Sequence, residues 1–545
     1  MTPFALLRTH ALILALIWSA AAAANDFVVT NTDDDGAGSL RQAIADANAI
    51  CRSGGMHTIS FAIPGTGVHT IRPLTPLPAL LSWVAIDGYT QPGSQMNTLA
   101  EGSNAALRIE LDGSLAGDSP GIALAITRFN ATDYCSARQS SISGLVINRF
   151  SQAGIKLDGC AFNDSNYTLC TMSDVDIRDN YIGTDASGTQ ALGNGLGIEI
   201  GINVKDLTIG TDSPPASAFM SNLISGNHGD GIWIAHVPDI NAATGILVRN
   251  NYIGLDAGGV HALGNSGHGI RADPAGLLVQ QNFIAANGGD GVNLASTNAW
   301  YGAGAAGVYA NKIGIGIHDE AFGNDGDGVH VDGHMIVSVT GDPANGGFAS
   351  RVANNGGAGV FVAASADTAG TSWPHVQVRG NSIRDNGGLG IDIAPVGVNP
   401  IRTDGDLLGP NENLNAPVLA SIAAGVPNGA NVPVTVSGSV HTVAQKDVDV
   451  YFHANTACDS SGHGEAEASP TQWRAHGTTD ANGDFAFTTQ FTVSAGSVSA
   501  GSFIAASTER FTTTNGFTQD LITSELSNCL RVPAADLIFR NGFDP

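Results

Sequence analysis

Acidic, basic and aromatic side chains recur at two fixed positions of a repeated motif, Gly-x-Gly-Ile/Val-x-apolar. In four successive copies the residue between the glycines is Asp230, His268, Asp290 and Asp327. The residue two places after the second glycine is Trp233, Arg271, Asn293 and His330. Carboxylates and imidazoles can transfer protons, an indole offers a flat apolar face, and a guanidinium can bind a carboxylate through two parallel hydrogen bonds. Together these groups are suited to binding or cleaving a sugar chain.

The motif belongs to a repeat unit whose spacing predicts a solenoid. The units lie mostly 29 to 31 residues apart, with two steps of 42 and 39, and begin at Asn180, Asn222, Asn251, Asn282, Asn311, Ser350 and Asn381. Each unit contains two short alternating apolar segments separated by Gly, Asn and Asp, which is typical of strands and turns. Helical solenoids need amphipathic stretches that the units lack, and a propeller blade needs roughly 40 to 50 residues. The pattern therefore predicts a parallel β-helix, with the first Asn of each unit stacked in a turn and bonded to the coils on either side.

In such a β-helix the Ile and Val of the motif point inward, so the two chemically active positions point outward. Equivalent positions of successive coils then lie side by side. We expect one outer row of Trp233, Arg271, Asn293 and His330, flanked by Asp230, His268, Asp290 and Asp327. The alternative is an ordinary solvated face, because Asp is also a good turn residue.

The start of the chain resembles an export signal. Residues 1–24 contain Arg8, a short apolar run and a series of alanines, and the mature chain is expected to begin near Asn25. The net charge of −26 argues against nucleic acid or an anionic membrane as partner, and no later run is apolar enough to span a bilayer. We expect a secreted or outer-surface protein, monomeric, with disulfides. Cys458 and Cys529 are expected to pair, whereas Cys51, Cys135, Cys160 and Cys170 allow three connectivities.

Residues 27–49, FVVTNTDDDGAGSLRQAIADANA, predict a strand, a turn and an amphipathic capping helix. This stretch resembles the opening of secreted bacterial β-helix proteins with the N-terminal signature named CSLREA, although Gly38 stands in place of the cysteine. Later segments, including NYIGTD at 180–185 and NLISGN at 222–227, are similar to the repeats of that family. The resemblance covers roughly residues 27 to 530 and implies a right-handed, pectate-lyase-like parallel β-helix. It implies no single activity.

After the repeats the pattern changes to longer alternating strands. We expect a signal peptide at 1–24, an N-terminal cap at 25–58, the β-helix at 59–400, a linker at 401–415, an immunoglobulin-like β-sandwich at 416–532 and a tail at 533–545. The sandwich resembles domains appended to such β-helices and is expected to act as a spacer or adhesion module. In the linker, Asp404, Asp406 and Asn411 are either calcium ligands or ordinary turn residues.

Three functions from different classes fit these residues. The first is a glycan-binding, adhesin-like surface protein, which we favour because no compact acid/base motif is present. The second is a polysaccharide lyase or glycoside hydrolase. In a lyase, Arg271 would neutralise a uronate carboxylate, His268 or His330 would take the C5 proton, and Ca²⁺ between stacked Asp side chains would acidify that proton. In a hydrolase, two of Asp230, Asp290 and Asp327 would be acid and base. The third is a purely structural envelope protein.

Overall fold

The computed structural model describes residues 25–51, 55–128, 134–159, 171–211, 222–235, 245–273, 276–296, 304–341, 349–364, 373–403, 408–426, 428, 431–494, 501–514 and 517–533. The expected signal peptide, Cys160 and Cys170, Asp404 and Asp406, and nearly all of the expected tail lie outside these residues. Among the described residues, no helix has the length and apolar character needed to cross a membrane.

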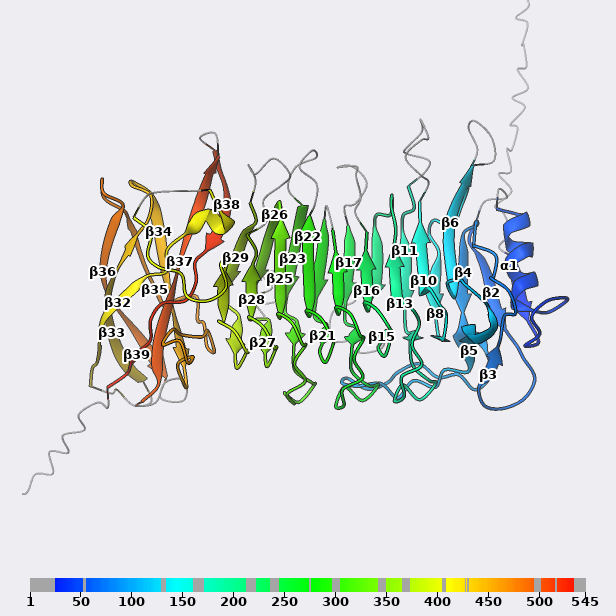
Figure 1. The fold of residues 1–545 in the computed structure, drawn as a ribbon. Coiled ribbons are helices and arrows are strands. Elements are labelled where there is room, and N and C mark those ends of the chain that lie inside the picture. Colours follow the sequence, from blue (N-terminus) through cyan, green and yellow to red (C-terminus); the bar gives the residue numbers. More distant parts are fainter. Residues whose placement is uncertain are drawn as a thin grey trace, which may run out of the picture.

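The chain from Asp26 to Ile393 forms a right-handed parallel β-helix, as predicted (Figure 1). Sheet A contains β1 (Asp26–Val29), β2 (His57–Phe61), β4 (Val84–Asp87), β8 (Ser141–Ser143), β11 (Val175–Arg178), β14 (Leu207–Gly210), β17 (Ile246–Arg249), β20 (Leu277–Gln280), β23 (Gly304–Tyr309), β26 (Met335–Thr340) and β29 (His375–Arg379). Sheet B contains β3 (His69–Ile71), β5 (Ile109–Asp112), β9 (Leu145–Asn148), β12 (Tyr181–Ile182), β15 (Leu223–Ile224), β18 (Tyr252–Ile253), β21 (Phe283–Ile284), β24 (Lys312–Ile313), β27 (Arg351–Ala353) and β30 (Ser382–Arg384). Sheet C contains β6 (Ile122–Arg128), β10 (Ala153–Asp158), β13 (Leu196–Ile200), β16 (Ile232–Ile234), β19 (Ile270–Ala272), β22 (Val292–Ser296), β25 (Val329–Gly333), β28 (Val360–Val362) and β31 (Ile391–Ile393), with β7 (Tyr134–Ser136) antiparallel to β6.

A complete coil of the regular region has three strands, not the two segments that the repeat pattern predicted. The difference arises where one expected segment, running from Val248 through to Ile253, is bent. Asn250 adopts φ of 57°, a left-handed conformation that Asn tolerates better than most residues. The bend ends β17 and starts β18, so a single apolar pattern supplies strands to two sheets.

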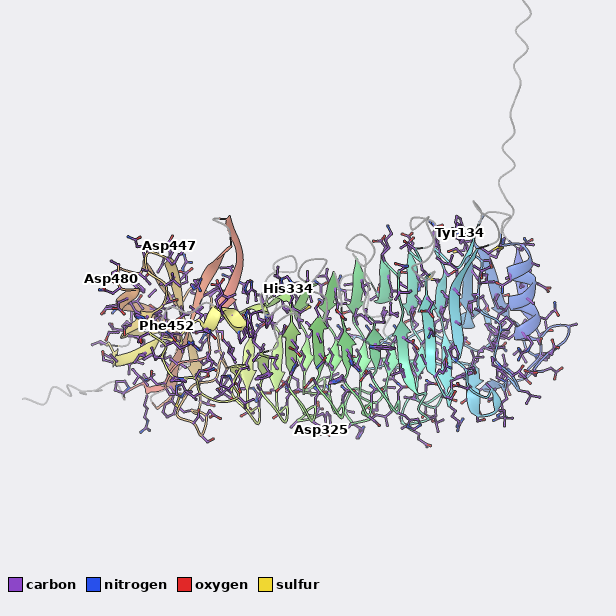
Figure 2. The ribbon with its side chains drawn as sticks, turned by 45° about the horizontal axis from the view of Figure 1, so that its top comes forward. Tyr134, Asp325, His334, Asp447, Phe452 and Asp480 are labelled. Carbon is purple, nitrogen blue, oxygen red and sulfur yellow. A yellow bond between two sulfur atoms is a disulfide. The ribbon has the colours of Figure 1, made fainter. Side chains whose placement is uncertain are left out.

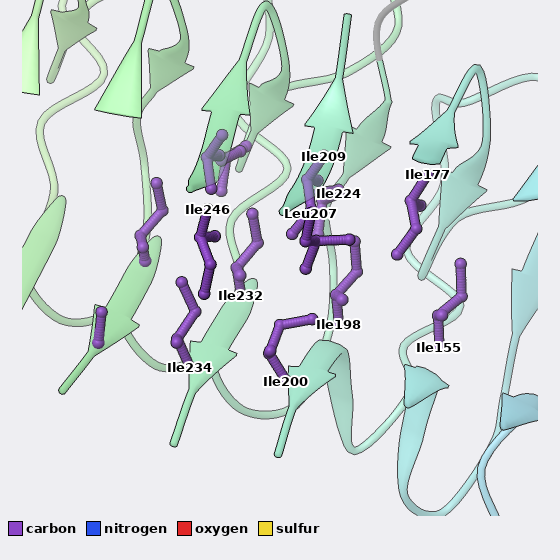
Figure 3. Close-up of a cluster of buried hydrophobic side chains, with 14 of the residues drawn as sticks. Ile155, Ile177, Ile198, Ile200, Leu207, Ile209, Ile224, Ile232, Ile234 and Ile246 are labelled. Atoms are coloured by element: carbon purple, nitrogen blue, oxygen red, sulfur yellow. The ribbon is translucent and has the colours of Figure 1, made fainter. Parts of the chain in front are cut away.

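The core is built from stacked aliphatic side chains. In sheet C, Ile155, Ile198, Ile232 and Ile270 pair in register and all have an exposed fraction of 0%. Figure 3 shows three of these side chains on neighbouring coils, facing those of sheets A and B across the interior. Each such side chain contributes about 1.5–3 kcal/mol by leaving water, so every inward position of the motif is committed to the core.

Two rows of buried Asn side chains join the coils at the turns. The predicted row passes from Asn180 through Asn222, Asn251 and Asn282 to Asn311, each Nδ2 donating to the Oδ1 of the next at 2.9–3.2 Å. This confirms the expected role of the first Asn. A second row, which the sequence analysis missed, connects Asn194, Asn227, Asn265, Asn287, Asn324, Asn355 and Asn386.

Three features close or brace the β-helix. The expected capping helix is α1 (Leu40–Ala49), which begins at the N-cap Ser39 and packs Leu40 and Ile44 into the core. The disulfide Cys51–Cys135 ties the end of this helix to β7. A segment of residues 95–106, the strap, lies along sheet B: Gly102 N donates to Tyr252 Oη at 2.8 Å across 150 positions of sequence. Short 3-10 turns occupy Gly88–Thr90, Gly113–Leu115 and Pro410–Asn413.

The C-terminal region is a β-sandwich of two antiparallel sheets, stapled by the expected disulfide Cys458–Cys529. One sheet contains β32 (Val418–Ala424), β33 (Asn431–His441) and β36 (Asp484–Ser494), and the other contains β34 (Asp447–Asn455), β35 (Arg474–Thr478), β37 (Phe503–Thr514), β38 (Phe517–Thr523) and β39 (Leu530–Arg531). Phe452 lies inside the sandwich and packs against Phe487 and Phe491 (Figure 2).

The sandwich covers the last coil of the β-helix. Amides of that coil that have no further coil to bond find acceptors on the sandwich or linker: Val376 N to Asn411 Oδ1, Val378 N to Thr523 Oγ1, Ile383 N to Ala466 O, Asp385 N to Glu465 Oε2 and Ile393 N to Glu525 Oε1. Ala466 and Leu526 also belong to the core of the β-helix. The sandwich therefore caps the open end of the β-helix, which the sequence analysis did not foresee.

Candidate active site on sheet C

The predicted register of the outer row is confirmed by the strand pairing. Trp233 pairs with Arg271, Arg271 with Asn293, and Asn293 with His330. The row continues to Glu199 before Trp233 and to Phe361 after His330, which hold the same position of the motif in their own copies. We call this set the outer row. Glu199 in turn pairs with Lys156, whose Nζ lies 2.8 Å from Glu199 Oε1. Lys156 was missed because its coil carries only the second glycine of the motif.

The second set of predicted residues forms a parallel row, the flanking row, in which side chains cap backbone amides of the next coil. Asp230 Oδ1 accepts from His268 N, His268 Nδ1 from Asp290 N, Asp290 Oδ1 from Asp327 N, and Asp327 Oδ1 from Ala358 N, at 2.7–2.9 Å. Each of these residues thus has a structural task. Each Asp side chain caps the backbone amide with one carboxylate oxygen, and its second oxygen is left for other partners.

The two rows meet in a compact cluster of Asp290, Asn293, Asp327 and His330. Asn293 Nδ2 donates to Asp290 Oδ2 at 2.7 Å, and His330 Nδ1 lies 2.9 Å from Asp327 Oδ2 and 4.0 Å from Asp290 Oδ2. The side chains of Asp290, Asp327 and His330 retain 12%, 17% and 23% of their exposure. They are therefore shielded but still reachable from solvent.

Hydrogen bonds and nearby charges shift the pKa values of Asp290 and His330 in opposite directions. Burial acts to raise the pKa of Asp290, but hydrogen bonds from the Asn293 amide and the Asp327 backbone amide, together with the charge of His330, hold that pKa below its usual value. Burial acts to lower the pKa of His330, yet the hydrogen bond to Asp327 and the charge of Asp290 hold it above its usual value. The carboxylate is thus kept ionised beside an imidazole that binds its proton more firmly.

The two histidines present different atoms to an incoming ligand. His268 Nδ1 is 2.9 Å from the amide nitrogen of Asp290 and 3.3 Å from its carboxylate. Because a backbone amide always carries its hydrogen, Nδ1 of His268 is an acceptor and the ring proton lies on Nε2. Nδ1 of His330 instead faces the Asp327 carboxylate at 2.9 Å. A carboxylate oxygen accepts, so the ring proton lies on Nδ1 and Nε2 can take up a proton. Of the two predicted bases, the geometry favours His330.

The aromatic and cationic members of the outer row are more accessible. Trp233 is half-buried and Arg271 is exposed, and among the described residues no hydrogen bond or ion pair engages the Arg271 guanidinium. Phe361 lies beside His330, with 5.2 Å between ring centroids. Asp392, the next rung, is buried, and burial together with the charge of Asp327 raises its pKa to about 6. The accessible part of the row therefore runs from Trp233 to Phe361.

Asp290, Asp327 and His330 also form a group that can hold a metal ion, with one ligand atom from each lying within 4.8 Å of the others. Two carboxylates and an imidazole match a transition metal better than Ca²⁺, which prefers six to eight oxygen ligands. Calcium at the stacked Asp side chains stays a prediction. In the linker, Asn411 is buried and uses its amide to hold the backbone of Val376 and Thr523, so its described contacts are those of a structural residue.

Comparison with known proteins gives no family assignment. No family model matches the chain, and no curated protein matches it. Two solved structures align along most of it. The Dettilon tailspike protein gp208 shares 12% identity, with 88% of this chain and 91% of that chain covered and a TM-score of 0.32. The enzymatically active domain of tailspike protein 4 of bacteriophage CBA120 shares 13% identity, with 89% and 66% covered and a TM-score of 0.32, so this chain spans just under two thirds of that one.

Proposed function

We propose that this protein binds an extracellular polysaccharide along the outer face of sheet C. The observation that carries the proposal is the in-register outer row, in which Trp233, Arg271, Asn293, His330 and Phe361 stand on five neighbouring strands. At about 4.8 Å per strand these rungs span roughly 19 Å, so several sugar units would contact the row at once.

Each rung offers a different contact to a sugar. The half-buried Trp233 and Phe361 supply apolar faces at the two ends, against which the C–H face of a pyranose packs. Arg271 supplies an exposed guanidinium whose paired donors match a carboxylate. This combination favours an acidic polysaccharide over a neutral one, despite the net negative charge of the chain, because surface charges are screened beyond about 8 Å.

Cleavage of that polysaccharide is the second candidate function, and the pair of Asp327 and His330 favours it. In a β-elimination, Asp327 would orient His330, Nε2 of His330 would take the C5 proton of a uronate, and Arg271 would neutralise the carboxylate of that sugar. A C4–C5 double bond would form as the C4–O bond breaks, and the departing oxygen would take a proton from water. Hydrolysis fits less well. Oxygens of Asp290 and Asp327 come within 4.8 Å, too close for an inverting pair at roughly 6.5–9.5 Å but near the roughly 5–5.5 Å of a retaining pair. The lowered pKa of Asp290 does not suit a general acid, so only a retaining mechanism with Asp290 as the nucleophile fits this geometry.

We further propose that the protein is exported and acts as a monomer outside the cell. Two disulfides in the described residues, the export-like sequence of residues 1–24 and the resemblance to CSLREA-type proteins support export. The sandwich would be an immunoglobulin-like domain of residues 416–532 following a linker at 401–415. A purely structural envelope role remains the third candidate.

The test is a screen of the mature protein against polyuronates and neutral polysaccharides, with and without calcium. Binding, unsaturated-product absorbance and reducing ends are followed together. We expect binding to a polyuronate that is weakened at least tenfold by Trp233→Ala or Arg271→Ala, whereas Leu278→Ala, on the outer face of sheet A in the same coil as Arg271, leaves it unchanged. Unsaturated product that His330→Ala abolishes would establish the lyase. Equal binding by all variants would refute the assignment to sheet C, and silence in all readouts would favour the structural role.

A further inference from the structure

A separate cavity lies where the β-helix, the linker and the sandwich meet. Its volume is about 200 Å³, below the roughly 300 Å³ at which pockets for drug-sized ligands begin. Its walls include Ile393 and Asn399 from the end of the β-helix, Leu414 and Asn415 from the linker, and Glu525 from the sandwich. The cavity is distinct from the outer row, because none of the five accessible rungs lines it.

Three polar side chains of this cavity, Asn399, Glu525 and Asn415, have acceptor atoms with capacity to spare. Both amide hydrogens of Asn399 are used, one on Ile393 O and one on Glu525 Oε1, while no described group donates to its Oδ1. Glu525 Oε1 accepts two hydrogen bonds, but Oε2 accepts only one, from Asn399 N. A carboxylate oxygen can accept about two.

Asn415 repeats this arrangement on the opposite wall. Its Nδ2 donates to Arg402 O and His441 O, and its Oδ1 accepts only from Arg402 N. The amide is thereby fixed in orientation, with its oxygen able to accept a second hydrogen bond. Side chains that are already held by the protein lose little entropy when a ligand binds them.

The apolar part of the wall comes from Ile393, Ala394, Pro395, Pro400, Leu414 and Ala416, and Arg402 and Asn413 complete the lining. We propose that this cavity binds a single neutral sugar unit or a polyol of similar size, whose hydroxyl groups donate to Asn399, Asn415 and Glu525 while its C–H face packs on the prolines and Leu414. A ligand rich in hydroxyl donors matches these three acceptors, whereas an anionic ligand would be repelled by the buried Glu525. Arg402 also borders the cavity, but its side chain is exposed and already has a partner. The burial of Glu525, which raises its pKa to about 7, makes this repulsion stronger as the pH rises above that value.

The site is tested by ligand-observed NMR and calorimetry on the full mature protein with glucose, galactose, mannose and glycerol, and with glucuronate as the anionic match. We expect one neutral ligand to bind saturably and glucuronate to bind at least tenfold more weakly at pH 8. Ala416→Leu fills the cavity without removing a polar group and is expected to abolish binding. Asn399→Asp, which keeps the size of the side chain but adds a charge, serves as a second variant. Its unfolding transition shows whether the junction between the β-helix and the sandwich still folds.

The outcomes separate this proposal from the function of sheet C. Trp233→Ala is expected to weaken polysaccharide binding and leave the small ligand bound, and Ala416→Leu is expected to do the reverse. Absence of binding by all four neutral probes at about 50 mM, roughly fifty times a Kd of about 1 mM, would overturn the proposal. Binding that survives Ala416→Leu would overturn it equally.

Discussion

The paired hydrogen bonds of Asp327 allow its structural and chemical roles to be separated by two substitutions. Asp327 Oδ1 accepts from Ala358 N at 2.7 Å, and Oδ2 faces His330 Nδ1 at 2.9 Å. Asp327→Ala removes both contacts. A partly buried amide left without an acceptor costs about 1–3 kcal/mol, and the half-exposed contact to His330 adds less than about 1 kcal/mol. We therefore expect Asp327→Ala to lower the free energy of unfolding by roughly 2 kcal/mol, about a thirtyfold change in the unfolding equilibrium.

Asp327→Asn should keep the fold and change the chemistry. The amide oxygen can still accept from Ala358 N, so the loss of stability should stay within about 1 kcal/mol. The amide nitrogen then faces His330 Nδ1 as a donor, which forces the ring proton of His330 onto Nε2. The pKa of His330 should also fall, because a neighbouring negative charge is lost. If the protein is a lyase, turnover should fall by about 10²–10⁴, since Nε2 can no longer accept a proton.

Urea denaturation measures the first effect, and nitrogen-15 NMR of the imidazole measures the tautomer and the pKa. Asp332→Asn is the matched control, because it removes a charge near His330 without touching Nδ1. Equal destabilisation by Asp327→Ala and Asp327→Asn would show that the bond to Ala358 N does not support the fold. A ring proton that stays on Nδ1 in Asp327→Asn would refute the argument for His330.

Three further predictions concern the frame that holds the site. Asn251→Ala should lower the free energy of unfolding by at least about 3 kcal/mol in thermal or urea denaturation, because several buried partners lose their hydrogen bonds. Asn251→Ser should lower it less, since Ser350 occupies the equivalent rung in its own coil. Tyr252→Phe should expose the strap to limited proteolysis and cost about 1 kcal/mol; unchanged cleavage would show that the strap is held by packing alone. Replacing Cys458 and Cys529 by Ser should lower the free energy of unfolding by roughly 4 kcal/mol by the chain-entropy relation for a separation of 71 residues, measured by urea denaturation against the oxidised wild-type protein.

The register of the outer row was predictable because two features of the motif determine it. The glycines place each copy at the same turn, and the inward Ile or Val sets which neighbours face solvent, so that Trp233 had to lie beside Arg271 once the β-helix was assumed. Lys156 escaped because its copy lacks the first glycine. The second Asn row did carry a signal that was overlooked, because six of its seven members stand two residues before the first glycine of the motif.

What could not be predicted depends on contacts between distant segments and on hydrogen bonds. Ile393 and Glu525 are 132 positions apart, and no local pattern connects them. The capping of amides by Asp290 and Asp327 looks in sequence like ordinary turn chemistry, because Gly-Asp-Gly serves both purposes. The tautomer of His268 follows from which atom receives the Asp290 amide, and that depends on geometry at the level of tenths of an ångström.

The carboxylates of the flanking row and those of the junction perform the same task, yet their pKa values move in opposite directions. Asp290 is surrounded by amide donors and lies near the His330 ring, so its pKa falls despite burial. Glu525 also accepts several donors, but burial and the nearby negative charge of Asp392 prevail and raise its pKa to about 7. A carboxyl group whose pKa is lowered by folding stabilises the fold at pH values above its pKa in the unfolded chain, and this stability is lost in acid. A carboxyl group whose pKa is raised by folding stabilises the fold at pH values below its pKa in the unfolded chain, and this stability is lost as the pH rises.

The contacts between the last coil of the β-helix and the sandwich should therefore lose stability between about pH 4.5 and 7, a range in which the flanking row keeps its stabilising charge. Hydrogen exchange read separately on β31 and β25 measures the two regions in one experiment. We expect protection of the Ile393 amide to fall across this range and that of the Asp327 amide to stay constant. Glu525→Gln removes the titration and should flatten the first profile, with the amide oxygen still able to accept from Ile393 N. A pH dependence that persists in Glu525→Gln would assign the effect to Asp392 or Glu465, whose pKa values burial also raises.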